Sequence, residues 1–369
     1  MVKHRVVVAM SGGVDSSVAA AMLVEAGHEC VGVFMRHGQP ALPPTAGLPI
    51  VTPAKPGHQG CCSAADALDA RRVADRLGIP LFALDLTDDF DRLVDHFAEE
   101  YGHGRTPKPC VRCNSWLKFG RLFDYAEAIG ASHVATGHYA RLSQATDGTQ
   151  QLRRGRDADR DQSYVLFDIR PERLDRMLLP VGDLTKREVR ERAAALGLAT
   201  AAKPDSQEIC FVAPGEHARL VAARLGGSRA GEIVAIDGRV LGRHDGIEQF
   251  TVGQRQGLGI ATGAPLYVVR IEADSRRVVV GSRDDVPQHR LEAAEATWLG
   301  APPQEPFMCD VQCRAQRGSA PAMVTPLPGG RFVAEFAGGP GASPGPISPG
   351  QPAVCYSGDR LLGGGWIVA

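Results

Sequence analysis

The chain has 369 residues, enough for two or three domains with real cores, and its 44% hydrophobic and 22% charged residues are ordinary for a globular protein. Forty-one Lys and Arg against 42 Asp and Glu leave a net charge of −1, which excludes nucleic-acid binding through overall charge, so any such surface must be local. No stretch approaches the roughly 18 apolar residues of a membrane span, and the run Val6–Met10 is too short for a signal peptide, so we expect a cytoplasmic protein whose nine cysteines are thiols, metal ligands or catalytic groups.

The first predicted element is a short strand, Val6–Met10, followed by a Gly- and Ser-rich turn and a helix over Val18–Ala26. Gly12 and Gly13 allow a tight turn whose N–H groups approach an anion. Ser16 lies at the helix start, where phosphate is favoured, and Asp15 is a carboxylate that can hold Mg²⁺ on the phosphates. No Lys follows the glycines, so this is not the G-x-x-x-x-G-K-[ST] loop. The pattern predicts a pyrophosphate-binding loop; the alternative is a plain Gly turn between a core strand and a helix.

Strand and helix patterns alternate from Val2 to about Gly137, which predicts an α/β fold with a doubly wound parallel sheet. Ligands of such sheets bind at the carboxyl ends of the strands. The loop after Met10, the strand end at Met35 and the Gly137 turn should therefore share one edge. The expected elements are strands at Val31–Met35, Leu81–Leu86 and His133–Thr136, and helices at Ala64–Gly78, Phe90–Tyr101 and Lys118–Ile129.

The remaining segments differ in residue composition and in their hydrophobic pattern. Arg36–Gly60 is rich in Pro, Gly and Ala and is interpreted as a loop or lid, whereas Thr185–Gly197 predicts a capped amphipathic helix. Beyond about Ala213, short β-branched runs separated by Gly turns favour small antiparallel β-units, the last a barrel from about Arg290. We expect three domains, over 1–212, 213–284 and 285–369.

Three cysteines are candidates for chemistry. Cys110 and Cys113 form a C-x-x-C pair in the Pro-containing segment Thr106–Asn114, and Cys210 lies in Lys203–Phe211. This spacing serves metal ligation or redox chemistry. Lys108, Arg112 and Lys203 either lower a thiol pKa or are ordinary solvated charges. Cys30, Cys309, Cys313 and Cys355 are interpreted as inert core residues, and Cys61–Cys62 is left out of the site.

Several motifs occur in the order found in the tRNA-specific 2-thiouridylases, which belong to the PP-loop ATPases, and the chain resembles this family over nearly its whole length outside Arg36–Gly60. The motifs are Ser11–Ser16, Phe34–Met35, Thr106–Asn114, Ala135–Tyr139, Asp161–Tyr164, Asp205–Phe211, Phe250–Gly259, Ser348–Gln351 and Leu362–Gly365.

The resemblance implies that ATP adenylates the C2 oxygen of the wobble uridine in tRNA, which sulfur then replaces. Cys210 would carry the sulfur as a persulfide, and Cys113 would release it, leaving a Cys113–Cys210 disulfide. The implied partners are tRNA and a sulfur-donor protein, and the chain is expected to be a monomer. The implied ATP-binding residues are Ala9, Met10, Ser11, Gly12, Gly13, Val14, Asp15, Ser16, Met35 and Gly137, and the implied tRNA contacts are Lys108, Pro109, Cys110, His138, Arg160, Asp161, Gln162, Arg314 and Gln351.

Two positions depart from the family pattern. Cys110 stands where many members carry Asp, and Ala315 stands where an aromatic residue is expected. With Cys110, Cys113 and Cys210, three thiols could bind a [4Fe–4S] cluster with one open iron that holds a sulfide, or a Zn²⁺ ion. The sequence leaves open the choice between a persulfide and a cluster-bound sulfide.

Two other functions stay open. One is an ATP-dependent amide or C–N ligase acting on a small metabolite, which would not need the three cysteines. The other is a non-catalytic tRNA- or metal-binding protein with a degenerate ATP loop, which the intact Ser11–Ser16 segment disfavours.

Overall fold

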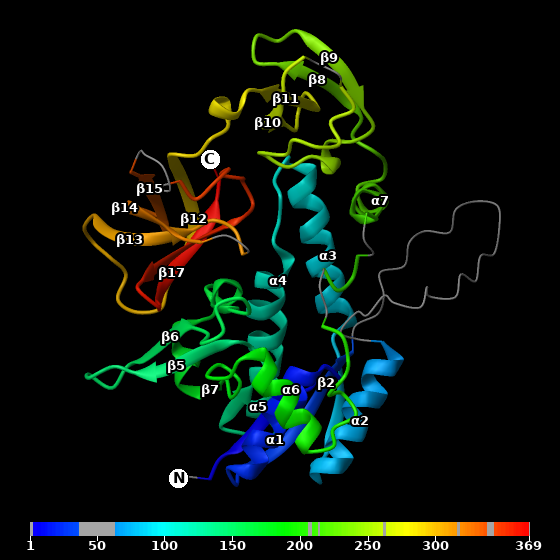
Figure 1. The fold of residues 1–369 in the computed structure, drawn as a ribbon, viewed down its shortest axis with the longest axis vertical. Coiled ribbons are helices and arrows are strands. Elements are labelled where there is room, and N and C mark those ends of the chain that lie inside the picture. The colour runs from blue at the N-terminus through cyan, green and yellow to red at the C-terminus, as the bar shows by residue number, and fades with distance from the viewer. Residues whose placement is uncertain are drawn as a thin grey trace, which may run out of the picture.

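The structure, a computed structural model, describes residues 3–36, 63–205, 209–212, 215–260, 263–315, 318–337 and 343–368. Most of the expected loop Arg36–Gly60, the pair Cys61–Cys62 and Ser206–Glu208 of the Cys210 motif lie outside these ranges. Figure 1 shows an α/β body at one end of the long axis, a small β-sheet body at the other, and a β-barrel beside them.

The predicted parallel sheet is confirmed. Its five strands run in the order β3-β2-β1-β4-β7, and every described pairing between them is parallel. Val6, Val7 and Val8 of β1 are completely buried, as expected for a central strand covered on both faces. The elements are β1 (Arg5–Ala9), α1 (Val14–Glu25), β2 (Glu29–Arg36), α2 (Ala64–Leu77), β3 (Leu81–Asp85), α3 (Thr87–Gly102), β4 (His133–Ala135), β7 (Met177–Leu178) and α6 (Lys186–Ala195).

The segment with the C-x-x-C pair is helical, and the expected helix start at Lys118 was wrong. Helix α4 (Pro109–Arg112) leads directly into a π-helix, η1 (Cys113–Arg121), and then into α5 (Leu122–Ala128). Pro109 is compatible with a helix start because its fixed φ is helical and its missing N–H would have no partner there. Both thiols of the pair therefore stand on the first turns of a helix.

The central body is a mixed four-stranded sheet in the order β10-β11-β8-β9. The expectation of an antiparallel unit is corrected at one pairing, because β11 runs parallel to β8. Its elements are α7 (His217–Arg224), β8 (Gly231–Ala235), β9 (Val240–His244), β10 (Tyr267–Glu272) and β11 (Arg277–Gly281), with short 3-10 turns at Ile247–Gln249 and Arg283–Asp285.

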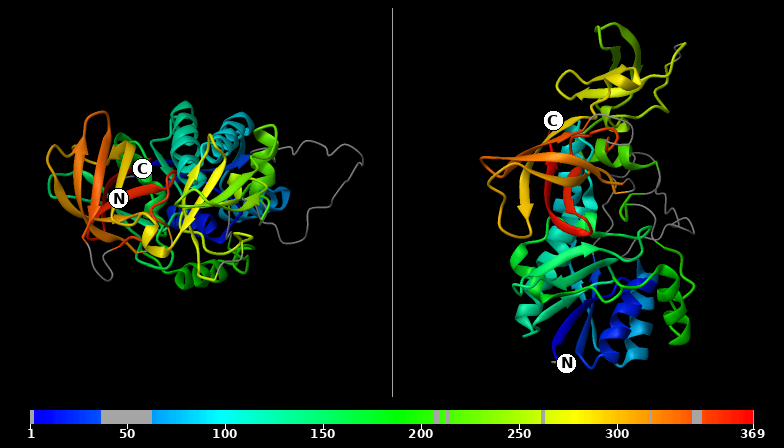
Figure 2. Two further views of the ribbon diagram at one scale, coloured as in Figure 1. Left: turned by 90° about the horizontal axis from the view of Figure 1, so that it is seen from above. Right: turned by 60° about the vertical axis from the view of Figure 1, so that its left-hand side comes forward.

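The last six strands form the predicted barrel, which closes through pairing of β12 with β17. A hairpin of the N-terminal region extends this sheet, since β6 pairs with β17 at Arg153 and Arg360. Figure 2 shows the barrel seated against this region. No described helix is long and apolar enough to cross a membrane. The elements are β5 (Ala140–Gln144), β6 (Gln150–Arg154), 3-10 turns at Ser163–Leu166 and Pro171–Arg176, β12 (Arg290–Trp298), β13 (Phe307–Gln312), β14 (Ala320–Leu327), β15 (Arg331–Phe336), β16 (Pro352–Ser357) and β17 (Arg360–Ile367).

Candidate functional site

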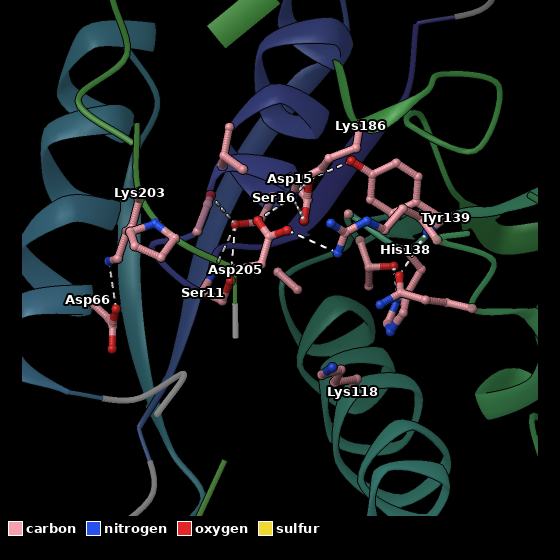
Figure 3. Close-up of a pocket in the computed structure, with 18 of the residues that line it drawn as sticks. Ser11, Asp15, Ser16, Asp66, Lys118, His138, Tyr139, Lys186, Lys203 and Asp205 are labelled. Atoms are coloured by element: carbon pink, nitrogen blue, oxygen red, sulfur yellow. Dashed lines mark hydrogen bonds and ion pairs between the residues drawn. The ribbon is translucent and has the colours of Figure 1, made fainter. Parts of the chain in front are cut away.

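A cavity of about 270 Å³ lies at the carboxyl edge of the parallel sheet, where the sequence predicted it (Figure 3). Of the ten residues expected to bind ATP, eight line this cavity. Met10 and Gly12 do not, because Met10 is buried in the core and the Cα of Gly12 faces the backbone of Asp66. The lining residues are Ala9, Ser11, Gly13, Val14, Asp15, Ser16, Met35, Asp66, Lys118, Thr136, Gly137, His138, Tyr139, Arg160, Gln162, Lys186, Lys203, Pro204 and Asp205.

The Gly- and Ser-rich loop is held by its own hydroxyl groups. Ser16 Oγ accepts the N–H of Ser11 at 3.2 Å and donates to the carbonyl of Gly13 at 3.1 Å. Gly12 has a φ of +71°, which an L side chain rarely adopts. Gly137 lies against the loop so closely that a Cβ there would be 2.6 Å from the N of Ser16. The loop is thus a rigid turn at the N-terminus of α1, a geometry suited to phosphate.

Lys186 joins the two central carboxylates of the cavity. Its Nζ donates to both oxygens of Asp15, at 2.8 and 2.9 Å, and lies 2.8 Å from Asp205 Oδ1. The Tyr139 hydroxyl also donates to Asp15, at 2.7 Å. Burial opposes the charged form of Asp205, but the hydrogen bond and charge of Lys186, with the charges of Arg160 and Arg190, outweigh it and lower the pKa of that carboxyl. Asp15, the expected Mg²⁺ ligand, thus already has a cationic partner.

Lys203 is paired with acids instead of activating a thiol. Its Nζ donates to Asp66 Oδ1 at 2.6 Å, to Asp69 Oδ2 at 2.7 Å and to the Gly12 carbonyl at 2.9 Å. These bonds tie the segment before Cys210 to the phosphate loop and to α2. The expectation that Lys203 is either a thiol activator or a solvated charge was therefore wrong.

His138 is a neutral, buried group at the far end of the cavity. Burial lowers its pKa well below the ordinary value, and the nearby charge of Lys118 lowers it further. Its Nδ1 is 2.7 Å from the Thr136 hydroxyl. Lys118 comes from the π-helix that begins at Cys113, so one helix contributes both a cavity cation and a candidate catalytic thiol.

Cys113 and Cys210 come together on one apolar cluster. Both are half-buried and pack, with Met35, against the cluster that contains Phe90 and Leu117. Met35 also lines the cavity, so the predicted ATP site and the cluster that both thiols contact share this side chain. The residue after Cys210 fixes the segment, because the ring of Phe211 meets Phe90 and Phe97 edge to face, at centroid distances of 5.4 and 5.3 Å.

The three cysteines do not form a metal site in this arrangement. Within the described ranges, no group of three or more His, Cys, Asp or Glu side chains is placed to hold a metal ion. Cys110 is absent from the apolar cluster that Cys113 and Cys210 contact. The donor set thus does not fit an iron–sulfur cluster or Zn²⁺.

The residues expected to contact tRNA lie in two places. Arg160 and Gln162 line the cavity with His138. Asp161 between them instead accepts bonds from the N–H groups of Gly155 and Ser163, at 2.9 and 3.0 Å, and pairs with Arg154. Asp161 therefore holds this loop together.

The other expected tRNA contacts lie between domains. The side-chain amide of Gln351 donates to the carbonyl of Thr106 at 2.6 Å, next to Lys108, Pro109 and Cys110. Arg314 donates to the carbonyl of Val252 at 3.0 Å, which joins the barrel to the central body. These contacts fix the barrel relative to both other bodies.

Sequence reasoning missed Lys186, Tyr139 and Asp205 as site residues. One signal was present for Lys186, which directly follows the N-cap Thr185. A cation in the first turn of a helix interacts unfavourably with the helix dipole, so a lysine at this position indicates a role other than stabilising the helix. Asp205 and Tyr139 lay within quoted motifs, but nothing local showed that they meet Asp15.

The doubly wound parallel sheet, the phosphate-type loop at its carboxyl edge and the barrel that follows define a multidomain nucleotide-binding protein of the PP-loop class.

Comparisons with known proteins agree with this class. Residues 4–214 match a model described as tRNA methyl transferase HUP domain, residues 220–282 a tRNA methyl transferase PRC-barrel domain, and residues 288–367 an aminomethyltransferase beta-barrel domain. The chain is 48% identical over 389 residues to the tRNA-specific 2-thiouridylase MnmA of Rhodopirellula baltica, covering 99% of this chain and 96% of that protein. It is 45% identical to the protein of the same name from Solibacter usitatus, with 100% of both chains covered. A solved 4-thiouridine synthetase–RNA complex with bound ATP has a TM-score of only 0.34 and 17% identity, covering 56% of this chain and 45% of that one. The chain belongs to the tRNA-specific 2-thiouridylase family.

Proposed function

We propose that this protein is a cytoplasmic tRNA-uridine 2-sulfurtransferase that uses ATP to activate the wobble uridine and a cysteine persulfide to thiolate it. The observation that carries the proposal is the placement of Cys113 and Cys210 on one apolar cluster with Met35, which lines the predicted ATP cavity. Full-length similarity to proteins named tRNA-specific 2-thiouridylase supports the choice of substrate.

In the first step, the C2 oxygen of the uridine attacks the α-phosphorus of ATP, and pyrophosphate leaves. The loop Ser11–Ser16 would hold the leaving pyrophosphate with Mg²⁺, and Lys186 and Lys118 would add positive charge to the cavity. This step is needed because a pyrimidine carbonyl oxygen is a poor leaving group, whereas AMP is a good one.

In the second step, the terminal sulfur of a Cys210 persulfide attacks C2, and AMP leaves. The Cys113 thiolate then attacks the Cys210 sulfur, and the S–S bond breaks with its electron pair going to the transferred sulfur. The products are 2-thiouridine and a Cys113–Cys210 disulfide, which a thiol reductant must reduce before the next turnover. A sulfur-donor protein would reload Cys210. No step uses an iron–sulfur cluster, because Cys110, Cys113 and Cys210 are not grouped to hold a metal within the part of the chain that the structure describes.

The test is nucleoside analysis of tRNA incubated with the protein, ATP, Mg²⁺ and a persulfide donor. We expect 2-thiouridine with the wild type and none with Cys113→Ser or Cys210→Ser. Both Cys variants should retain ATP- and tRNA-dependent pyrophosphate release, which reports adenylation, because AMP leaves only when the sulfur attacks. Asp15→Ala should lose pyrophosphate release as well. Thiolation by either Cys variant would refute the persulfide scheme. AMP release that needs no tRNA would instead indicate a ligase acting on a small metabolite.

A further inference from the structure

Arg112, the residue before Cys113, is held by Asp168 of the N-terminal region and by two side chains of the C-terminal barrel. Its Nη1 lies 3.1 Å from Asp168 and its Nη2 lies 2.6 Å from Glu295 of β12. Its guanidinium also stacks on the ring of Trp366, 4.3 Å from the ring centroid, near the end of β17. The Arg112 and Asp168 side chains are each 11% exposed, whereas Glu295 is 67% exposed, so the buried guanidinium meets a carboxylate at the surface of the barrel.

The helical turn that bears Cys113 is also tied to the 165–168 segment by the two residues that follow the thiol. Asn114 Nδ2 donates to the carbonyl of Val165 at 3.1 Å, and Ser115 Oγ donates to Asp168 at 2.8 Å. Asp168 in turn accepts the hydroxyl of Thr297, from β12, at 3.3 Å. The barrel thus reaches the turn around Cys113 directly through Arg112 and indirectly through Asp168.

Glu295 has an unusual backbone that serves this contact. It is one of two non-glycine residues in the described chain with a positive φ, at 50°. It stands where the register of β12 against β17 shifts between Ala294 and Thr297. A bulge of this kind changes the direction in which a side chain points. A non-glycine residue keeps a positive φ when the surrounding structure stabilises it. Here the bulge directs the carboxylate of Glu295 to Arg112.

None of these groups contacts the ATP cavity. Arg112, Asp168, Glu295 and Trp366 are all absent from its lining. A change in this cluster should therefore leave nucleotide binding intact while it alters the position of the Cys113 thiol, which packs against the apolar cluster.

We propose that Arg112 is a positioning residue through which the docked barrel sets the orientation of the Cys113 thiol, so that barrel docking controls sulfur release but not adenylation. This rests on the proposed function for the role of Cys113. In this role Arg112 acts through the position of Cys113 and not on the reacting sulfur atoms.

The decisive variant is Glu295→Asn, because Asn tolerates a positive φ but is too short to reach Arg112. Arg112→Met and Arg112→Lys accompany it, and Lys should keep more activity than Met. Glu292→Gln is the matched control, since Glu292 stands on the same strand and pairs with Arg331 away from the cluster. Three quantities are measured: tRNA-dependent pyrophosphate release in a single turnover, kcat and KM for thiolation, and the alkylation rate of Cys113 by peptide mass spectrometry.

We expect Glu295→Asn to lower kcat for thiolation by about tenfold, with KM for tRNA and single-turnover pyrophosphate release within about twofold of wild type. The alkylation rate of Cys113 should change by about threefold or more, and Glu292→Gln should match wild type in all three. The proposal is overturned if Cys113 alkylation is unchanged, if single-turnover pyrophosphate release falls in parallel with thiolation, or if only KM rises. If the wild type makes no 2-thiouridine, the proposed function fails, whereas Cys113 alkylation in Glu295→Asn still tests the positioning role.

Discussion

Replacing Lys186 with Met tests whether the ion-pair network of the cavity is built around this lysine. The Lys186 and Asp205 side chains are 12% and 14% exposed and their charged atoms are 2.8 Å apart. At an effective dielectric constant of about 20, the attraction at this distance is about 6 kcal/mol before desolvation is subtracted. Removing one partner of a fully buried pair costs about 3–5 kcal/mol.

The expected loss in this protein is smaller because Asp205 keeps other partners. Arg160 and Arg190 lie 3.0 and 2.8 Å from it. We therefore expect Lys186→Met to lower the free energy of unfolding by about 2–3 kcal/mol. Asp15 adds little to this loss, since its side chain is 33% exposed and it keeps the Tyr139 hydroxyl.

Urea unfolding of a double-mutant cycle measures the coupling. Lys186→Met, Asp205→Asn and the double variant should give a coupling energy of about 1–3 kcal/mol. Arg187→Met is the control on the same helix, because its pair with Glu191 is exposed and should be worth less than about 0.5 kcal/mol. Additive losses from Lys186→Met and Asp205→Asn would show that the network does not depend on Lys186.

Three further outcomes follow from particular contacts. The pKa of His138 is well below its unfolded value in the folded protein, so the unfolded state binds more protons below about pH 6.5 and the free energy of unfolding falls as the pH drops. His138→Gln should reduce this dependence on pH by up to about 1.4 kcal/mol per pH unit. Unfolding measured between pH 5 and 7.5 checks this. Gly350→Ala should destabilise the protein by about 1–3 kcal/mol, because the φ of Gly350 is +88° and a Cβ would be 2.8 Å from the N of Thr106. A melting temperature equal to that of wild type would argue against this contact. Phe211→Ala removes two edge-to-face contacts beside Cys210 and should lower thiolation at least about tenfold, with single-turnover pyrophosphate release kept. Equal loss of both activities would mean that Phe211 supports the whole domain.

The local part of the site could be predicted from the sequence because its determinants are close in the chain. The strand, the glycines and Ser16 lie within one short segment, and their pattern alone predicts a phosphate loop at a sheet edge. The parallel sheet followed from alternating strand and helix patterns. The parallel pairing of β8 with β11 could not be predicted, because the residue pattern of a strand does not indicate which other strand pairs with it.

The charged part of the cavity depends on tertiary structure. Asp15, Lys186 and Asp205 come from α1, α6 and the segment after it, and only the fold brings them together. The helix start at Pro109 was missed for another reason. The two prolines of the segment favour an extended chain before each of them, but the second one also suits the first position of a helix, and that preference prevails.

Gln351 illustrates how one side chain can serve both the fold and the proposed tRNA contact. Its amide has two donor hydrogens and an acceptor oxygen, and within the described residues one bond is made by its nitrogen, to the Thr106 carbonyl. The second hydrogen and the oxygen remain for a ribose or phosphate group. Gln351→Glu would keep the size of the side chain but place a carboxylate against a carbonyl, so it should weaken the barrel contact as well as repel RNA. Gln351→Ala would remove both roles at once. A rise in KM for tRNA in Gln351→Ala is therefore evidence for a direct contact only if Gly350→Ala, which disturbs the same junction without removing the amide, leaves that KM unchanged.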